Sequence, residues 1–330
     1  LNPQAANLYF NWHYKKKRTD RCPLDIAKKT SSYINEFFHF DLPKIKFVHE
    51  SEDKTVKLLF ELRDGSSVES VLIPFHQKYS LCVSSQVGCA MKCSFCFTGT
   101  QGLKRNLSPD EIVGQFLGAW QWLEKNRKSD GRWIENIVFM GQGEPLHNFE
   151  NVKTACEIFL DKHGSSLGHQ KITISTSGFI PGLKRWAAEI PGVNLALSLH
   201  STRTEIRNEL IPINRKYPLR EVLAWIESIP LAKKQFVTYE YLLIDNLNDS
   251  IDDAHATGEL LKDKAAYINL IPFNPFPGSS YKRPSLAKIE NFKRVLDKYK
   301  IPTLIRGTKG DDVLAACGQL NTALEDKLSH

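Results

Sequence analysis

Four of the seven cysteines lie in one stretch of the sequence, residues 81–107. Three of them, Cys89, Cys93 and Cys96, are spaced C-x3-C-x2-C. Thiolates this close together, in a chain with no evident export signal, are metal ligands more often than halves of disulfides. Three thiolates leave a position open for a further molecule, which suits an iron–sulfur cluster better than structural zinc. The spacing therefore predicts an iron–sulfur cluster.

Two other interpretations of these cysteines stay open. A zinc ion would need a fourth ligand from elsewhere, such as Cys82, Cys317 or a histidine. Alternatively, all of these cysteines are reduced side chains of an ordinary core.

The elements that must position the cysteine loop are predicted by hydrophobic periodicity. From residue 81 onward, short apolar runs alternate with helical stretches, which is typical of βα units and a parallel sheet. Six such units are too few for a closed eight-stranded barrel, so we predict an α/β fold with an open, partial (β/α)6 barrel. The expected strands are 81–85, 136–140, 171–176, 193–199, 237–244 and 267–271, and a last strand at 302–306 extends or flanks the sheet. The expected helices lie near 109–125, 149–162, 181–189, 219–229 and 249–261.

Four regions are expected along the chain. Residues 1–50 have apolar residues at roughly helical spacing and predict an N-terminal helical domain. The chain begins at Leu1 rather than at a methionine, so we expect this domain to be truncated. Residues 51–80 predict a β-hairpin linker, 81–301 the barrel, and 302–330 a C-terminal strand followed by a cysteine-bearing loop.

In barrels of this kind, functional residues follow the strands, at the carboxyl edge of the sheet. The second strand is followed by Gly-Gln-Gly-Glu-Pro, where Gly143 lets the backbone approach a ligand and Glu144 can accept from an ammonium group. A simple turn ended by proline is the alternative. Ser175 and Ser198 end the third and fourth strands, where a hydroxyl binds a ligand or only caps a helix. His200, taken alone, is most simply a core residue.

The charge balance fits a polyanionic partner. The net charge is +7, and basic stretches at 203–207 and 211–216 follow the fourth strand on the expected rim. RNA contact is therefore expected there. The hydrophobic content is 42%, and no apolar run approaches the ~20 residues that a membrane-spanning helix needs.

The wider amino-acid sequence around the cysteines resembles that of a known family. The string CVSSQVGC…KCSFCFTGTQG…RNL is similar to the radical S-adenosylmethionine (SAM) signature and, within it, to the RlmN/Cfr family of RNA adenine methyltransferases. The segments GEPL, IPFNPFPG and GDD…AACGQL extend the resemblance along nearly the whole chain. GEPL and IPFNPFPG favour the RlmN branch, although Gln142 stands where many members have methionine.

The resemblance implies roles for individual residues. It implies a 4Fe-4S cluster on the three loop cysteines, a methyl-carrying Cys317, a resolving Cys82 and a proton-accepting Glu69, which alone would be an exposed strand residue. SAM contacts are implied at Gly143, Glu144, Ser175, Ser198, Leu199, His200 and Asn274.

The family's chemistry implies two SAM molecules per turnover. One methylates Cys317. The second yields a 5′-deoxyadenosyl radical, which activates this methyl group so that it can add to a ring carbon of adenine that is not itself nucleophilic. Cys82 then forms a transient disulfide with Cys317 and frees the methylated base. The base must be unstacked or flipped to reach the site.

The resemblance also implies a substrate and partners. The RlmN branch methylates carbon 2 of an adenosine in 23S ribosomal RNA, and some members also modify a transfer-RNA adenosine beside the anticodon. The Cfr branch modifies carbon 8 instead. A cytoplasmic monomer served by an external electron donor, a flavodoxin or ferredoxin, is expected, with no membrane. Two competing functions are a non-catalytic, metal-bearing RNA-binding protein and a radical enzyme acting on a protein or small molecule.

Overall fold

The computed structural model describes residues 3–20, 28–37, 41–127, 134–231 and 235–322. Their main feature is a ten-stranded sheet in the order β1-β2-β3-β4-β7-β8-β9-β10-β11-β12. The strands are β1 Lys44–Glu50, β2 Val56–Glu61, β3 Ser67–Phe75, β4 Lys78–Cys82, β7 Ile134–Phe139, β8 Ile172–Thr176, β9 Asn194–Ser198, β10 Val237–Leu243, β11 Ala266–Pro272 and β12 Thr303–Ile305. A separate small sheet pairs β5 Gln86–Gly88 with β6 Leu103–Asn106.

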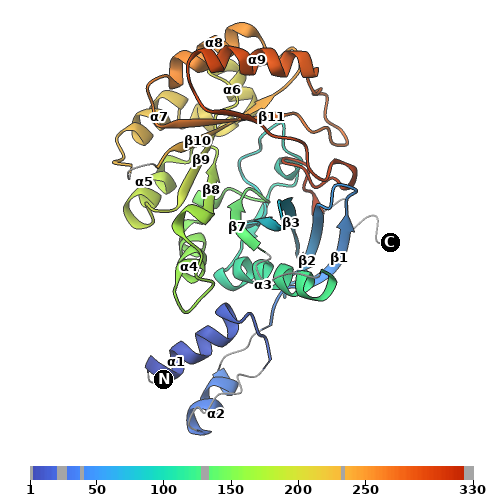
Figure 1. Cartoon of the computed structure of the whole chain (residues 1–330), viewed down its shortest axis with the longest axis vertical. Helices are drawn as coiled ribbons and strands as arrows, with labels where there is room; N and C mark the ends of the chain where they lie inside the picture. The colour runs from blue at the N-terminus through green and yellow to red at the C-terminus, as the bar shows by residue number, and fades with distance from the viewer. Residues whose placement is uncertain (1–2, 21–27, 38–40, 128–133, 232–234, 323–330) are drawn as a thin grey trace.

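The sheet changes character at β4. From β4 to β12 every neighbouring pair is parallel, whereas β1 to β4 are antiparallel. Helices cover the outside of the curved sheet in Figure 1. They are α3 Pro109–Asn126, α4 Phe149–Leu160, α5 Ile180–Glu189, α6 Thr204–Leu210, α7 Leu219–Glu227, α8 Ile251–Leu261 and α9 Leu286–Lys298. This mixed α/β arrangement, with an open parallel sheet, confirms the predicted fold class.

Local sequence explains where these elements begin. Helix α3 starts at a capping box, in which the side chains of Ser108 and Glu111 bind each other's backbone N–H groups, and Pro109 occupies the first turn. Helix α8 starts at a second capping box formed by Ser250 and Asp253. The apolar faces of these helices pack on the sheet and form one continuous core.

The N-terminal part differs from the prediction. Helices α1 Pro3–Phe10 and α2 Lys28–Phe37 lie apart from the sheet (Figure 1). The helical prediction for residues 1–50 is wrong at its end, because Lys44–Glu50 forms strand β1, paired with β2. The hairpin of β2 and β3 is likewise part of the main sheet, between β1 and β4.

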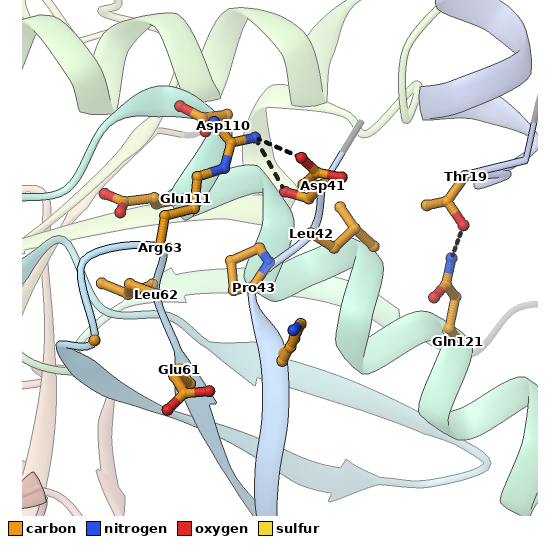
Figure 2. A pocket seen from close by; sticks show the side chains of 12 residues that line it. Thr19, Asp41, Leu42, Pro43, Glu61, Leu62, Arg63, Asp110, Glu111 and Gln121 are labelled. Atoms are coloured by element: carbon orange, nitrogen blue, oxygen red, sulfur yellow. Dashed lines mark hydrogen bonds and ion pairs between the residues drawn. The ribbon is translucent and has the colours of Figure 1, made fainter. Parts of the chain in front are cut away.

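A hollow of about 650 Å³ lies where the segment after α2 meets α3 and the β2–β3 turn (Figure 2). Arg63 reaches Asp41 across it at 3.8 Å, and Gln121 donates to Thr19 at 3.4 Å. Both members of the ion pair are mostly exposed, so the pair contributes at most about 1 kcal/mol. None of the predicted site residues lines this hollow. In the part of the chain that the structure describes, no helix is both long and apolar enough to cross a membrane.

Candidate functional site

A cavity of about 150 Å³ opens at the carboxyl edge of the parallel strands. Its wall combines the cysteine loop and the Cys317 loop with residues of β10 and β11 and with the ends of β7, β8 and β9 and the segments that follow them. Among the predicted site residues it is lined by Cys89, Cys93, Cys96, Gly143, Glu144, Ser175, Ser198, His200 and Cys317. The fold therefore gathers residues that are more than 200 positions apart in the sequence onto one rim.

The three loop cysteines face the same end of this cavity. Burial raises the pKa of Cys89 to about 12 and that of Cys93 well above its ordinary value. The neighbouring thiols Cys96 and Cys89 raise the pKa of Cys93 further, which reports their closeness. Thiols with such raised pKa values gain most from a cation that stabilises the thiolate.

The arrangement of the three cysteines indicates which kind of metal centre they could hold. Among the residues that the structure describes, no three His, Cys, Asp or Glu side chains are gathered closely enough for a single metal ion. A 4Fe-4S cluster binds each thiolate through a different iron atom, so it is served by thiols that converge without touching one ion. The three soft ligands on one loop fit such a cluster.

Glu144 lines the same cavity and is held there by three hydrogen bonds. One carboxylate oxygen accepts from the Leu146 backbone N–H at 3.1 Å, and the other accepts from the backbone and hydroxyl of Ser177 at 2.8 and 2.7 Å. Burial raises the pKa of Glu144, and the Ser177 and Leu146 donors oppose that rise. A buried, oriented carboxylate of this kind can bind an ammonium group.

Gly143 allows this arrangement through its backbone. Its φ angle is +106°, and a Cβ atom there would come within 2.6 Å of the Gln86 Cβ and 2.8 Å of the Gln86 backbone nitrogen. The neighbouring Gln142 also has a structural role, since its side-chain oxygen accepts from the Glu69 backbone N–H at 3.2 Å.

Leu199 and His200, which follow β9, have different surroundings. His200 is buried with φ +56°, and its Nδ1 accepts from the Leu242 backbone N–H at 3.1 Å. Phe95, from the cysteine loop, packs edge-on against its ring at 4.7 Å. Leu199 is buried but does not line the cavity; its backbone N–H donates to Glu240.

Arg207 braces this edge of the sheet, and sequence reasoning missed it. It is fully buried and donates to the carbonyl oxygens of Ser177, Ser198 and Leu199 at 3.0, 2.9 and 3.1 Å. Burial lowers its pKa to about 10, so it stays charged at neutral pH. Because Arg207 is buried, the RNA contact expected of residues 203–207 would have to involve other residues of that stretch, and it stays a prediction. In the sequence, nothing distinguishes Arg207 from an exposed basic residue, so its bracing role could not be predicted.

Cys317 lines both the main cavity and a smaller one of about 40 Å³. Cys82 also lines this smaller cavity, and burial raises its pKa to about 12. The loop that carries Cys317 is tied to the cysteine loop, because Phe97 N–H donates to the Gly318 carbonyl at 2.7 Å. Asn274 lines the smaller cavity and not the main one. Its side chain donates to the Cys317 carbonyl at 3.1 Å, so it contacts the loop that carries Cys317.

Arg306 is a second residue that sequence reasoning did not select. It follows β12 and lines the smaller cavity with the two cysteines. The nearby Cys317 thiol raises the pKa of Arg306, and Arg306 in turn opposes the rise in the pKa of Cys82. Arg306 therefore places a positive charge beside the two thiols, but burial is the larger effect and keeps the pKa of Cys82 high.

Glu69 is buried rather than exposed, which corrects the expectation drawn from strand alternation alone. Its carboxylate pairs with the Lys57 ammonium at 3.4 Å, and both side chains are almost wholly inaccessible, at 0% and 3%. Neither residue lines the two cavities. Glu69 lies beside the smaller cavity, two residues before Val71, which does line it.

Comparison with known proteins agrees with the open βα barrel and the three cysteines at its carboxyl edge. Residues 83–257 match the family model of the radical SAM superfamily. The crystal structure of a radical SAM methyltransferase from Sphaerobacter thermophilus is 36% identical and superposes with a TM-score of 0.88. That match covers 96% of this chain and 93% of the other. The chain belongs to the radical SAM superfamily, and it is similar to a methyltransferase over nearly its full length.

Two further solved structures are more distant. SuiB from Streptococcus suis, bound to S-adenosylmethionine, is 14% identical over 71% of this chain and 52% of its own, with a TM-score of 0.48. A domain of a pyruvate-formate lyase-activating enzyme from Bacteroides vulgatus is 17% identical over 52% of this chain and 99% of its own, with a TM-score of 0.38. Membership of the superfamily implies a 4Fe-4S cluster and SAM.

Proposed function

We propose that this radical SAM protein methylates carbon 2 of an adenosine in 23S ribosomal RNA, with Cys317 as the methyl carrier. The observation that carries the proposal is the position of Cys317 between two cavities. It lines the main cavity together with the three cluster cysteines and the smaller cavity together with Cys82. A carrier needs both neighbours, because its methyl group must be activated at the cofactor and its sulfur must later be released.

The residues of the main cavity divide the work of holding the cofactors. Cys89, Cys93 and Cys96 would hold the cluster, and Glu144 would hold the ammonium group of SAM. Ser175, Ser198 and His200 line the remaining wall. Bound there, the cluster and SAM supply a carbon-centred radical for chemistry at an unreactive ring carbon. The burial of this wall keeps water away from such a species.

The smaller cavity would hold the reacting thiols. Cys82, once deprotonated, would attack the Cys317 sulfur: an S–S bond forms, the S–C bond to the methylated base breaks, and its electron pair stays on the base, while the Arg306 charge beside the thiols opposes part of the burial cost of the Cys82 thiolate. Glu69 takes the proton that the base must lose. Asn274 positions Cys317 by its hydrogen bond to the Cys317 carbonyl.

The remaining assignments belong to the same proposal. We take the protein to be a cytoplasmic monomer that receives electrons from a flavodoxin or ferredoxin. Its main substrate would be ribosomal RNA, and transfer RNA would be a second substrate. The net charge of +7 favours such a polyanionic substrate. The domain division proposed from the sequence, at residues 50, 80 and 301, stays a proposal; residues 323–330 of its last segment lie outside the described part.

An anaerobic assay tests the proposal. The cluster-reconstituted protein receives protein-free 23S RNA, a reductant and SAM with a labelled methyl group, and the digested nucleosides are identified by mass spectrometry. We expect labelled 2-methyladenosine that disappears with Cys317→Ala. Labelled 8-methyladenosine would replace the carbon 2 assignment. SAM cleavage without any methylated nucleoside would contradict the RNA substrate and favour a protein or small-molecule substrate, and zinc in the anaerobically purified protein would favour a non-catalytic RNA-binding protein.

A further inference from the structure

The Lys57–Glu69 pair is an unusual feature of the sheet interior. The two charged side chains are 3.4 Å apart and are 3% and 0% exposed. They come from adjacent antiparallel strands, β2 and β3. Long charged side chains are seldom fully buried, because removing two charges from water costs more than a surface pair returns. A buried pair of this kind is therefore a reason to look for a function at its position.

The register of the strands places the pair beside the reacting thiols. Lys57 is opposite Val71, and Val71 is opposite Cys82, so these three side chains share one face of the sheet. Val71 and Cys82 both line the small cavity that Cys317 closes. Glu69 shares this face and lies about 7 Å from Val71 along the strand, beyond the end of β4.

Backbone contacts fix Glu69 at this position. Its N–H donates to the Gln142 side chain at 3.2 Å, and its carbonyl accepts from the Ser84 hydroxyl at 2.6 Å. Both partners belong to segments that follow barrel strands, so Glu69 is tied to the same rim as the cluster loop. Its position is set by the barrel rather than by the hairpin alone.

Electrostatics then decide the protonation state. A carboxyl group buried alone takes up a proton, because burial disfavours the charged form. An ammonium within about 4 Å reverses that preference and keeps the carboxylate ionised. Only the ionised carboxylate can accept a proton from a substrate. Lys57 therefore supplies what a buried base at this position needs.

We propose that Lys57 is the positioning residue that keeps Glu69 ionised, so that Glu69 accepts the proton lost by the target base. The inference rests on the proposed function and deepens it. In this step the C–H bond of the substrate breaks, its electron pair stays on the substrate, and the proton moves to a Glu69 oxygen. The neutral Glu69 then leaves the Lys57 ammonium without a counter-charge, which favours return of the proton once the product has left.

Other titratable groups lie near the pair. His49 of β1 lies opposite Lys57, one strand further from the cavity. Cys82 of β4, together with Cys317 and Arg306, lines the cavity. Lys57 forms an ion pair with Glu69 at 3.4 Å.

The first experiment measures the protonation of Glu69 directly, without RNA. Infrared spectra of protein labelled with 13C-glutamate are compared with those of Glu69→Gln, which identifies the Glu69 band. At neutral pH we expect an ionised band in the wild type, a protonated band in Lys57→Met, and the ionised band again in Lys57→Arg. An ionised Glu69 in folded Lys57→Met, or a protonated one in the wild type, would overturn the proposal.

The second experiment follows turnover against pH. The acid limb of the 2-methyladenosine rate should move upward by about 1–3 pH units in Lys57→Met and return in Lys57→Arg. Formation of 5′-deoxyadenosine and methylation of Cys317 should stay unchanged, while a covalent protein–RNA adduct accumulates. An unmoved acid limb, with a shifted Glu69 band, would make the pair purely structural and overturn the catalytic part. A wild type that makes no methyladenosine would instead remove the proposed function, and the infrared result would still decide whether Lys57 sets the ionisation.

Discussion

His200 illustrates how a single residue at this site is constrained by its backbone and its surroundings. Its φ of +56° lies in the left-handed region, and it is buried against Phe95 with Nδ1 accepting a backbone hydrogen bond. An acceptor nitrogen in a dry environment requires the neutral ring. The sequence alone offered only a lone histidine after a strand, and the structure supplies the reason that it must stay uncharged.

The first prediction concerns pH and stability. Burial, with a smaller effect from Arg207, lowers the pKa of His200 to about 3. In the unfolded chain it is about 6.5, so between these values the unfolded state binds a proton that the folded state does not. The contribution is complete above about pH 6.5 and is lost as the pH falls toward 3, by about 4–5 kcal/mol in total.

Urea unfolding of the apo protein between about pH 7 and pH 4.5 measures this effect. His200→Asn is the matched control, because asparagine tolerates the left-handed backbone and does not titrate. We expect a shallower loss of stability in the variant over this range. An equal slope in both proteins would mean that His200 carries no such linkage.

At the scale of elements, much of the barrel was predictable. The strand runs 136–140 and 237–244 fall within one or two residues of β7 and β10, because short apolar runs between helical stretches are an unambiguous pattern. Strand β1 was not predicted, although its Lys44–Glu50 sequence alternates and its burial alternates with it. The burial of Glu69 was not predictable from alternation, because β2 and β3 are covered on both faces. Helix α9 was readable from its apolar spacing but was not assigned.

A glycine pair tests how the turn after β7 builds the cofactor site. Gly143→Ala adds a Cβ within 2.6 Å of Gln86 at a positive φ, so both strain and collision follow. Gly65→Ala has φ +78° but meets no atom within 4 Å, so it adds strain alone. We expect Gly65→Ala to cost about 1 kcal/mol and to leave SAM binding intact.

Gly143→Ala should cost several times that amount and weaken SAM binding at least tenfold, as measured by denaturant titration and equilibrium dialysis. Equal SAM affinity in the two variants would show that the close approach at Gly143 is not needed for binding.

The loop that carries Cys317 is latched to the β1–β2 turn. Asp312 accepts from the Ser51 hydroxyl at 2.5 Å and from the Glu52 backbone at 3.2 Å, and the Gly310 backbone donates to Asp53 at 3.3 Å. Asp312→Ala should therefore release the loop, since it removes two of these three contacts between distant segments.

Hydrogen exchange of residues 307–322 is the direct readout of this latch. We expect exchange there to rise severalfold, transfer from Cys317 to fall, and SAM cleavage to stay near the wild-type rate. Asp297→Ala, which removes an exposed i,i+4 pair with Lys293, is the control and should change neither. Unchanged exchange in Asp312→Ala would show that the loop is held by other contacts.

At the scale of the whole molecule, the N-terminal helices form a separate piece against the barrel (Figure 1). Two of their contacts with the barrel involve lysine side chains. The Lys17 ammonium lies 3.9 Å from the Trp120 ring, and Lys15 donates to the Lys162 carbonyl at 3.0 Å. Surface contacts of this kind contribute little to stability, whereas the basic residues among them suit a phosphate backbone.

Removal of residues 1–40 should therefore separate RNA binding from radical chemistry. We expect SAM cleavage and Cys317 methylation within about twofold of the full chain, with RNA affinity reduced at least tenfold and a smaller salt dependence. Circular dichroism and thermal unfolding verify that the barrel stays folded. Undiminished RNA affinity would place the RNA surface on the barrel itself.

The central claim is that the transferred methyl group passes through Cys317, and a single-turnover label experiment tests it most directly. The protein is first incubated with SAM carrying a deuterated methyl group, freed of excess SAM, and then given RNA, reductant and unlabelled SAM. If Cys317 is the carrier, the first methyladenosine formed contains deuterium. An unlabelled methyl group in that first product would mean that it comes straight from the second SAM, which contradicts the account.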